Sequence, residues 1–176
     1  MKLIQRNAFY EKLYFQEMTE RDRLDDRFRT LLAIVAVVFA ILTTLCNVVV
    51  MAELSKPLIF WFVFALAVMS FVAAVVCYIK AWHSQYYQAF PLPIDIEAYI
   101  SQIDEFYRAQ TDEETASQWT DEAFDEFMRT SFIEHASFNA RSNDNKRFWL
   151  YYGNSFVIGA LAFSLMAFVP VADFFL

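Results

Sequence analysis

Glycine is nearly absent from this sequence: only Gly153 and Gly159 occur, against 20 phenylalanines. A phosphate-binding loop needs several glycines close together, so nucleotide binding through such a loop is excluded. The sequence also lacks a Ser/His/Asp set and a His/Cys cluster with the spacing of metal ligands. We therefore predict neither a cofactor nor a metal site.

The sequence also contains few cysteines and has no net positive charge. Cys46 and Cys77 both fall inside apolar runs, and we interpret them as small packing residues rather than a disulfide. The formal net charge is −7, which argues against general nucleic-acid binding through a basic surface.

Apolar residues, in contrast, make up 58% of the chain, which is high for a soluble domain. A helix needs about 20 apolar residues to cross the hydrocarbon core. Three uncharged runs reach that length: 31–51, 58–79 and 148–169. The third begins with an aromatic belt, and a re-entrant or buried helix is its alternative. The expected fold class is an all-α integral membrane protein with an N-terminal helix, a two-span hairpin, a cytoplasmic helical insert and a third, C-terminal membrane helix.

The distribution of Lys and Arg predicts the orientation, because these residues collect on the cytoplasmic side. Residues 1–30 carry seven of them and residues 80–147 carry six, whereas the 52–57 turn carries only Lys56. We expect the N-terminus and the 80–147 insert in the cytoplasm, with the turn and the 171–176 tail outside.

These patterns divide the chain into four expected parts. They are a cytoplasmic N-terminal helix (1–30), a transmembrane hairpin (31–79), an acidic cytoplasmic helical domain (80–147) and a C-terminal membrane helix with its tail (148–176). No Gly or Pro interrupts the chain before Pro57, so the first helix is expected to continue straight into its span.

The insert is expected to be helical after a break at FPLP, residues 90–93. An apolar face predicts a helix over 95–110. A capping box with Thr111 as N-cap and Glu114 at N3 comes next. From there to Val169 we expect one long helix or two nearly collinear ones. The insert carries thirteen acidic against six basic residues, which indicates either a solvated face or, if several copies ring a pore, a cation-attracting vestibule.

Arg129 and His135, six residues apart, form the one candidate catalytic pair. The spacing resembles the loose Arg-to-His pattern of HEPN ribonucleases. That resemblance implies a site built from two chains, in which His acts as acid and base and Arg stabilises the phosphate charge. On a helix the two side chains are about 120° apart. The structural alternative is an ion pair of Arg129 with Asp125 or Glu126 on its own helix.

Small and weakly polar residues interrupt the first and third apolar runs. Such residues let membrane helices approach closely and form hydrogen bonds between them. We interpret them as pore-lining or protomer-contact positions, with internal packing of the three helices as the alternative. The candidates are Thr43, Thr44, Asn47, Asn154, Ser155 and Gly159. Arg141, Lys146 and Arg147, just before the third run, are interpreted as the cytoplasmic membrane boundary.

The whole outline, together with the Arg129 and His135 spacing, resembles the small membrane accessory proteins of type VI-B CRISPR systems. It is also similar to the broader two-span SLATT-like membrane effectors of bacterial anti-phage operons. The resemblance implies a homo-oligomeric ring in the lipid bilayer of the bacterial inner membrane. Such a ring would support an RNA-guided CRISPR ribonuclease by depolarising the infected cell.

Three functions are therefore weighed: an oligomeric membrane pore, a membrane-tethered HEPN-like ribonuclease, and a non-catalytic anchor for a cytoplasmic partner. The charge-free spans argue against an ion-coupled transporter, which normally needs an ionisable residue at the midplane.

Overall fold

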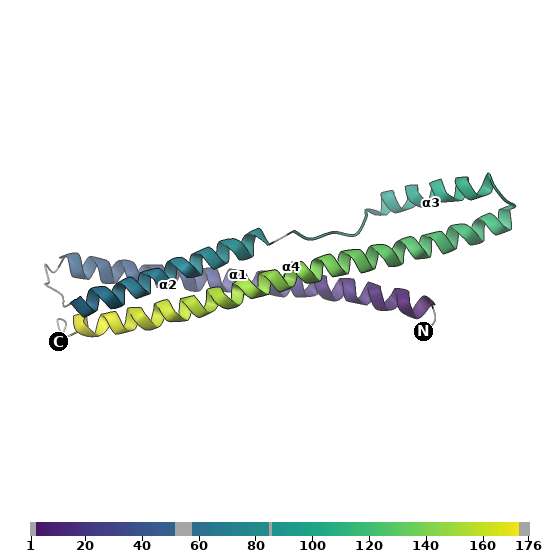
Figure 1. The fold of residues 1–176 in the computed structure, drawn as a ribbon. Helices are drawn as coiled ribbons and strands as arrows, with labels where there is room; N and C mark the ends of the chain where they lie inside the picture. Colours follow the sequence, from purple (N-terminus) through teal and green to yellow (C-terminus); the bar gives the residue numbers. More distant parts are fainter. Residues whose placement is uncertain (1–2, 52–57, 85, 173–176) are drawn as a thin grey trace. The chain divides into compact units, whose positions relative to one another are not determined.

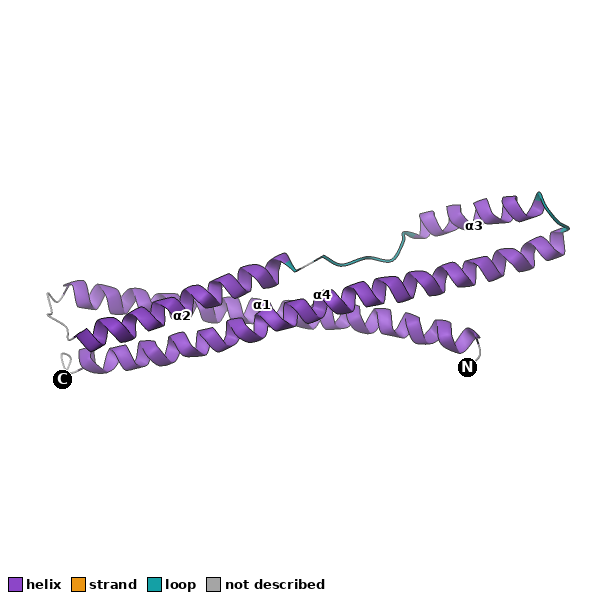
Figure 2. Cartoon of the chain, in the orientation of Figure 1, coloured by secondary structure: helices purple, strands orange, loops and turns teal. Residues whose placement is uncertain are grey.

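The computed structural model describes residues 3–51, 58–84 and 86–172. Its elements are four helices, shown in Figures 1 and 2: α1 (Leu3–Met51), α2 (Leu58–His83), α3 (Pro93–Arg108) and α4 (Glu113–Ala172). Because these described ranges contain no strand, the all-α prediction is confirmed. The predicted outer turn, 52–57, and residues 173–176 of the tail lie outside the described residues.

The first helix is unbroken, as its sequence predicts. α1 runs from the charged N-terminal stretch into the first apolar run. It contains no proline, which would remove a backbone hydrogen bond, and no glycine, which has a low helix propensity. Its threonines donate their hydroxyl protons to the backbone carbonyl four residues earlier, as Thr43 does to Phe39 at 2.8 Å. These hydroxyls therefore do not interrupt the helix.

The last helix begins one residue later than the predicted capping box requires. The backbone N–H of Thr115 donates to Oδ2 of Asp112 at 3.1 Å, so Asp112 is the N-cap and the assignment of Thr111 and Glu114 to a capping box is wrong. A carboxylate accepts this bond well and is favoured at the positive end of a helix. From Glu113 the helix continues to Ala172, which confirms the single long helix over two collinear ones.

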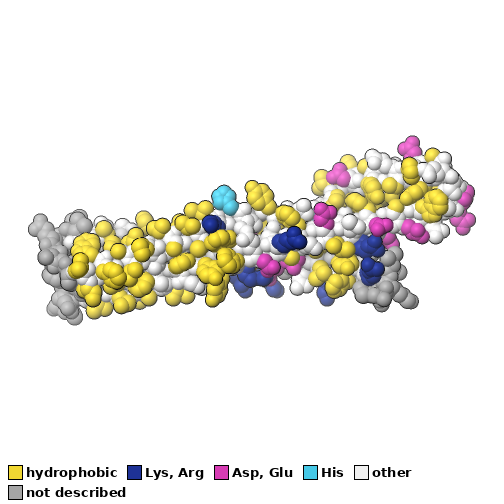
Figure 3. Space-filling view, in the orientation of Figure 1, with side chains coloured by type: hydrophobic (Ala, Val, Ile, Leu, Met, Phe, Trp, Pro, Cys, Tyr) yellow, Lys and Arg dark blue, Asp and Glu magenta, His cyan; other side chains and the backbone are white. Residues whose placement is uncertain are grey.

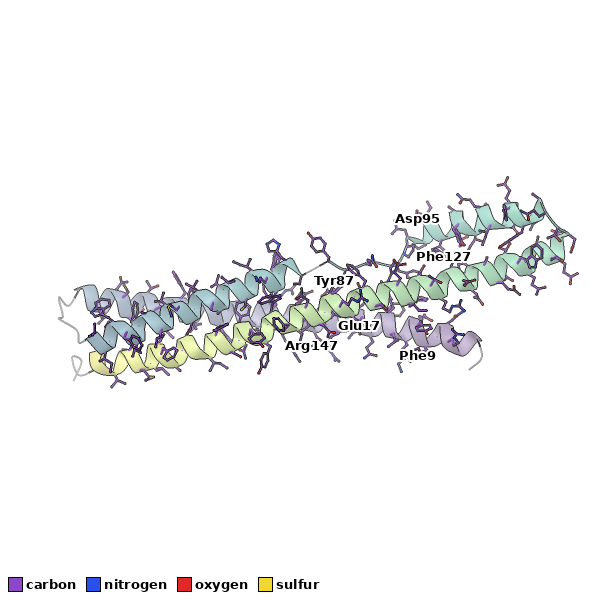
Figure 4. All side chains as sticks on the ribbon, viewed as in Figure 1. Phe9, Glu17, Tyr87, Asp95, Phe127 and Arg147 are labelled. Carbon is purple, nitrogen blue, oxygen red and sulfur yellow. The ribbon has the colours of Figure 1, made fainter. Side chains whose placement is uncertain are left out.

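α3 is set off from α2 by an irregular segment that includes residues 86–92, so the break begins before the predicted residues 90–93 and Pro93 belongs to α3. It starts at Pro93, where a fixed φ and a missing N–H suit the first turn of a helix. It packs on α4 through aromatic rings: the Tyr99 centroid is 4.4 Å from that of Phe127, which Figure 4 labels, and the Tyr107 and Trp119 centroids are 5.6 Å apart.

The chain forms two compact units that cut across the long helices. We call Met1–Arg21 with Tyr86–Asn143 the polar unit, and Asp22–Gln85 with Asp144–Leu176 the apolar unit. Within the described residues, α1, α2 and α4 are each long and apolar enough to cross a membrane.

Small residues let the three helices of the apolar unit pack closely. Ala67, Ala74 and Ala81 on α2 are fully buried, as is Ala160 on α4. Gly153 is buried against the ring of Tyr78, where an added Cβ would lie 2.8 Å from Cε1. The outer face around α2 is covered by hydrophobic side chains (Figure 3), as expected for helices that contact lipid.

The polar unit has an aromatic core of its own. Tyr14, Phe132 and Ala136 are buried together, and Phe90 stacks on Phe132 with ring centroids 4.5 Å apart. The backbone N–H of Phe90 donates to the Tyr14 hydroxyl at 3.1 Å. These contacts join α1, α4 and the segment before α3.

Candidate functional site

The structure places Arg129 and His135 in different surroundings on α4. Nη2 of Arg129 donates to Oε1 of Glu126 at 3.1 Å, which is one of the two ion pairs expected as the structural alternative. His135 is half-buried in the aromatic core, with its ring centroid 6.0 Å from that of Phe90 and 6.5 Å from that of Tyr14. Six residues along a helix separate them by about 9 Å of rise as well as about 120°.

This geometry does not bring the two groups to one phosphate within a single chain. Phosphate cleavage of the kind expected needs the acid or base and the cation at the same group. Nδ1 of His135 is buried and has no hydrogen-bond partner among the described residues. Its aromatic neighbours make it a packing residue of the polar unit in this conformation.

The polar residues of the first apolar run lie on the outward side of α1. Thr43, Thr44 and Asn47 are exposed, while Leu42, directly before them, and Leu45 are buried. The threonine hydroxyls donate to the carbonyl oxygens of Phe39 and Ala40 at 2.8 and 2.9 Å. The Asn47 amide forms no side-chain hydrogen bond with the rest of the described chain.

Three exposed alanines lie on the same outward side of α1 as these polar residues, and polarity alone did not identify them. Ala33, Ala36 and Ala40 are all exposed. At about 100° per residue, Ala36, Ala40 and Asn47 share one side of the helix, opposite the buried Val38 and Leu42. We call Ala33, Ala36, Ala40, Thr43, Thr44 and Asn47 the α1 outer face. The small-residue spacing from Ala36 to Ala40 to Thr44 was visible in the sequence.

The polar residues of the third apolar run divide between two sides of α4. Asn154 and Ser155 are exposed, and Ser155 donates to the Tyr151 carbonyl at 3.1 Å. Gly159 is half-buried, with the Ser70 hydroxyl 3.6 Å from the position of an added Cβ. Gly159 therefore contributes to packing between α2 and α4, whereas Asn154 and Ser155 face outward.

The three cations interpreted as the membrane boundary have three different environments. Arg141 is exposed. Arg147 pairs with Asp144 at 2.8 Å and is about half exposed. Lys146 is completely buried, forms an ion pair with Asp25 and lies 5.9 Å from the centroid of the Phe28 ring. Lys146 therefore holds α4 against α1 inside the apolar unit.

Two asparagines that the sequence analysis passed over organise the polar unit. Asn139 Oδ1 accepts from the Gln88 backbone N–H at 2.9 Å, and its Nδ2 donates to the Gln88 carbonyl at 3.1 Å. Asn143 accepts from the Tyr87 hydroxyl at 2.8 Å and donates to the backbone and side-chain oxygens of Glu17, each at 2.9 Å. Figure 4 labels Glu17 and Tyr87, which belong to α1 and to the segment after α2.

These bonds give the irregular segment before α3 a fixed partner on α4. Asn139 and Asn143 are 0% and 1% exposed, so each bond replaces one that water would otherwise supply. Their spacing of four residues, which places them on one side of a helix, is the one signal that could have identified them.

An acidic surface lies along the start of α4. A shallow groove of about 700 Å³ is lined there by Glu113, Glu114, Asp121, Glu122 and Asp125, together with Ser117 and Gln118. No cluster of three or more potential metal-ligating side chains is present within the described ranges.

Fold and exposed polar residues together define a class: an all-helical chain with three helices long and apolar enough to cross a membrane. Comparison with known proteins does not define the class of protein more closely, because no family model, no curated protein and no solved structure matches the chain.

Proposed function

We propose that this chain is a homo-oligomeric membrane pore in which the α1 outer face meets either a second copy or the pore lumen. Its three apolar helices span the bilayer, and the N-terminus and the acidic 80–147 insert lie in the cytoplasm. The observation that carries the proposal is the exposed Asn47 amide, with Thr43 and Thr44 beside it, on an otherwise apolar membrane helix.

An amide exposed to hydrocarbon is unfavourable because lipid cannot replace its hydrogen bonds to water. Thr43 and Thr44 avoid this cost through bonds to their own helix, but Asn47 has no such bond among the described residues. The exposed alanines next to it allow close approach of another helix, as small residues do in membrane bundles. Both features fit a face that is covered or hydrated in the assembled protein.

Three helices are too few to enclose a pathway, so conduction requires several copies. A face containing Asn47 could line the lumen, or it could seal one copy against the next. The acidic groove at the start of α4 supports preference for cations, because clustered carboxylates raise the local cation concentration.

Flux through reconstituted protein tests the pore. Purified protein in vesicles loaded with potassium should dissipate the membrane potential, read with a potential-sensitive dye. Asn47→Leu should reduce the flux at least severalfold, whereas Cys46→Leu should leave it near wild type. Cys46 is also exposed, but lies about 100° around the helix from Asn47. Equal effects of the two substitutions, or no flux from wild type, would contradict the proposal.

Asn47→Asp separates lumen lining from protomer contact. A carboxylate facing the lumen should raise the cation-to-anion permeability ratio while the number of copies stays the same. A carboxylate buried between copies should instead dissociate the oligomer, because it has no cationic partner there.

The cellular role proposed for the pore is that of an accessory effector in RNA-guided anti-phage defence, acting with a CRISPR ribonuclease. This part rests on the resemblance in layout and on the Arg129 and His135 spacing alone. Phage challenge of cells that express the ribonuclease with and without this protein tests it. Protection should increase with wild type and fall back with Asn47→Leu. Protection that is lost with His135→Ala, together with RNA cleavage by the purified wild type, would favour the tethered ribonuclease instead.

A further inference from the structure

A groove of about 630 Å³ lies between α1 and α4 within the apolar unit. Arg27 and Thr30 line it from α1, and Arg147, Tyr151 and Asn154 line it from α4. Leucines form its apolar part: Leu24, Leu31 and Leu150.

The groove lies at the change from charged to apolar sequence on both helices. Arg27 is four residues before Leu31, the first residue of the first uncharged run, and Arg147 directly precedes Phe148, the first residue of the third. In a spanning protein this level corresponds to the lipid headgroups. The polar part of the groove therefore lies where phosphates lie, and its leucines lie where acyl chains begin.

Charge favours an anion in this groove. Arg27 and Arg147 are the two cations that line it, and Asp26 is the one acidic residue. The Asp26 carboxylate is 80% exposed and already lies 3.9 Å from Arg29. Arg147 contacts Asp144, and its side chain, which lines the groove, is about half exposed. The net excess is positive in a chain whose formal charge is −7.

Hydrogen-bonding groups complete the lining. Tyr151 is 70% exposed, which leaves its hydroxyl accessible. Asn154 is exposed and makes no side-chain hydrogen bond within the described ranges. As with Asn47, an amide at this depth needs a polar partner from outside the chain. Basic pockets between membrane helices recognise anionic phospholipid headgroups in this way.

We propose that this groove binds one anionic phospholipid. Arg27 and Arg147 bind its phosphate, and Tyr151 and Asn154 donate hydrogen bonds to its glycerol ester oxygens. Leu31 and Leu150 contact the first methylenes of its acyl chains. The site acts independently of whether the protein forms a pore.

Native mass spectrometry of the full chain in detergent tests the site, with dioleoyl phosphatidylglycerol and dioleoyl phosphatidylcholine as competing probes. Wild type should retain phosphatidylglycerol at least fivefold in excess over phosphatidylcholine. The double variant Arg27→Gln/Arg147→Gln should lose about tenfold in affinity for phosphatidylglycerol, since each cation near a phosphate contributes severalfold.

The matched control is Arg6→Gln/Arg141→Gln. It removes two exposed cations that do not line the groove, and it should change binding less than twofold. If the double glutamine variant does not fold, Thr30→Trp fills the groove from an exposed position and should block lipid retention.

Four results would overturn the proposal. They are no preference by wild type, equal losses in both double variants, retention by Thr30→Trp at the wild-type level, and displacement of the lipid by millimolar inorganic phosphate. The last would indicate a site for a free anion. Copies that associate through this groove would appear as oligomers without bound lipid.

Discussion

The contacts that stabilise the inside of the polar unit differ from those inside the apolar unit, although both units contain parts of α1 and α4. In the apolar unit, alanines and Gly153 bring backbones close, and the contacts are almost entirely apolar. In the polar unit, aromatic rings pack around Tyr14, and Asn139 and Asn143 bind the segment before α3 through directed hydrogen bonds.

The difference follows from the surroundings each unit is proposed to have. Lipid tails are as apolar as leucine, so moving a leucine from lipid to a helix contact gains little free energy. Membrane helices therefore associate mainly through close packing. In water the burial of aromatic rings is itself favourable. We therefore expect substitutions in the two units to have separate effects on stability.

The largest effect is expected where the apolar unit departs from this rule, at the pair of Lys146 and Asp25. Asp25→Ala leaves a fully buried ammonium without its counter-ion, which should lower the free energy of unfolding by about 3 kcal/mol. Adding Lys146→Met should restore most of that loss. Thermal unfolding in detergent measures both. If the double variant is as unstable as the single one, the pair is not what holds α4 to α1.

A somewhat smaller loss is expected in the polar unit from Asn143→Leu. Three partner groups on Glu17 and Tyr87 lose their bonds, which should reduce stability by about 2 kcal/mol. Hydrogen exchange should increase around residues 86–90 and leave α2 unchanged. Asn145→Leu is the control, because its bond to Ser84 is exposed and water can replace it. Equal exchange in α2 would show that the two units unfold together.

Alanine substitutions at the two glycines test how closely the helices pack at two positions of the apolar unit. Gly153→Ala places a Cβ 2.8 Å from the Tyr78 ring, so α4 must shift, at a cost of about 1–2 kcal/mol. Gly159→Ala has room, with its nearest neighbour at 3.6 Å, and should be neutral or slightly stabilising. Melting temperatures in detergent decide this. A Gly159→Ala variant that is the less stable of the two would contradict the packing described.

The smallest effect concerns the start of α4 and depends on pH. Hydrogen bonds donated by the backbone and side chain of Thr115 lower the pKa of Asp112 below its ordinary value. The stabilisation of the first turn is therefore complete above the ordinary pKa and is lost as the pH falls through the lowered one. The hydrogen exchange rate of residues 113–116, taken relative to the rate of the unfolded chain at the same pH, should rise on acidification in wild type. It should rise less in Asp112→Asn, which keeps a cap that does not ionise. Identical pH profiles would refute the assignment.

Helix periodicity and the uncharged runs were enough to predict an all-helical chain with three membrane-length segments. The absence of Gly and Pro before Pro57 predicted the unbroken α1. What the sequence could not reveal depends on the angle at which each helix faces its neighbours. Lys146 is charged and was assigned to the cytoplasmic membrane boundary, but it is buried, and α1 supplies Asp25 and Phe28 to cover it.

The candidate sites show the same limit. Thr43, Thr44 and Asn47 were identified from their polarity, and the structure adds that they face outward beside three alanines. For Arg129 and His135 the spacing resembles that of a site built from two chains, and within one chain a continuous helix separates the two residues in angle and height. Experiments must test the roles predicted for the α1 outer face, for Asn154 and Ser155, and for the His135 ring.

The central claim is that the protein is an oligomer, and of the two placements proposed for the α1 outer face it takes contact with further copies of the chain. The most direct measurement is the mass of the purified particle in detergent, by light scattering with the detergent contribution subtracted. Wild type is expected to be larger than a dimer, and Ala40→Leu, which blocks close approach on this face, should reduce the number of copies. A monomeric or dimeric wild type, or an Ala40→Leu particle of unchanged mass, would contradict the claim.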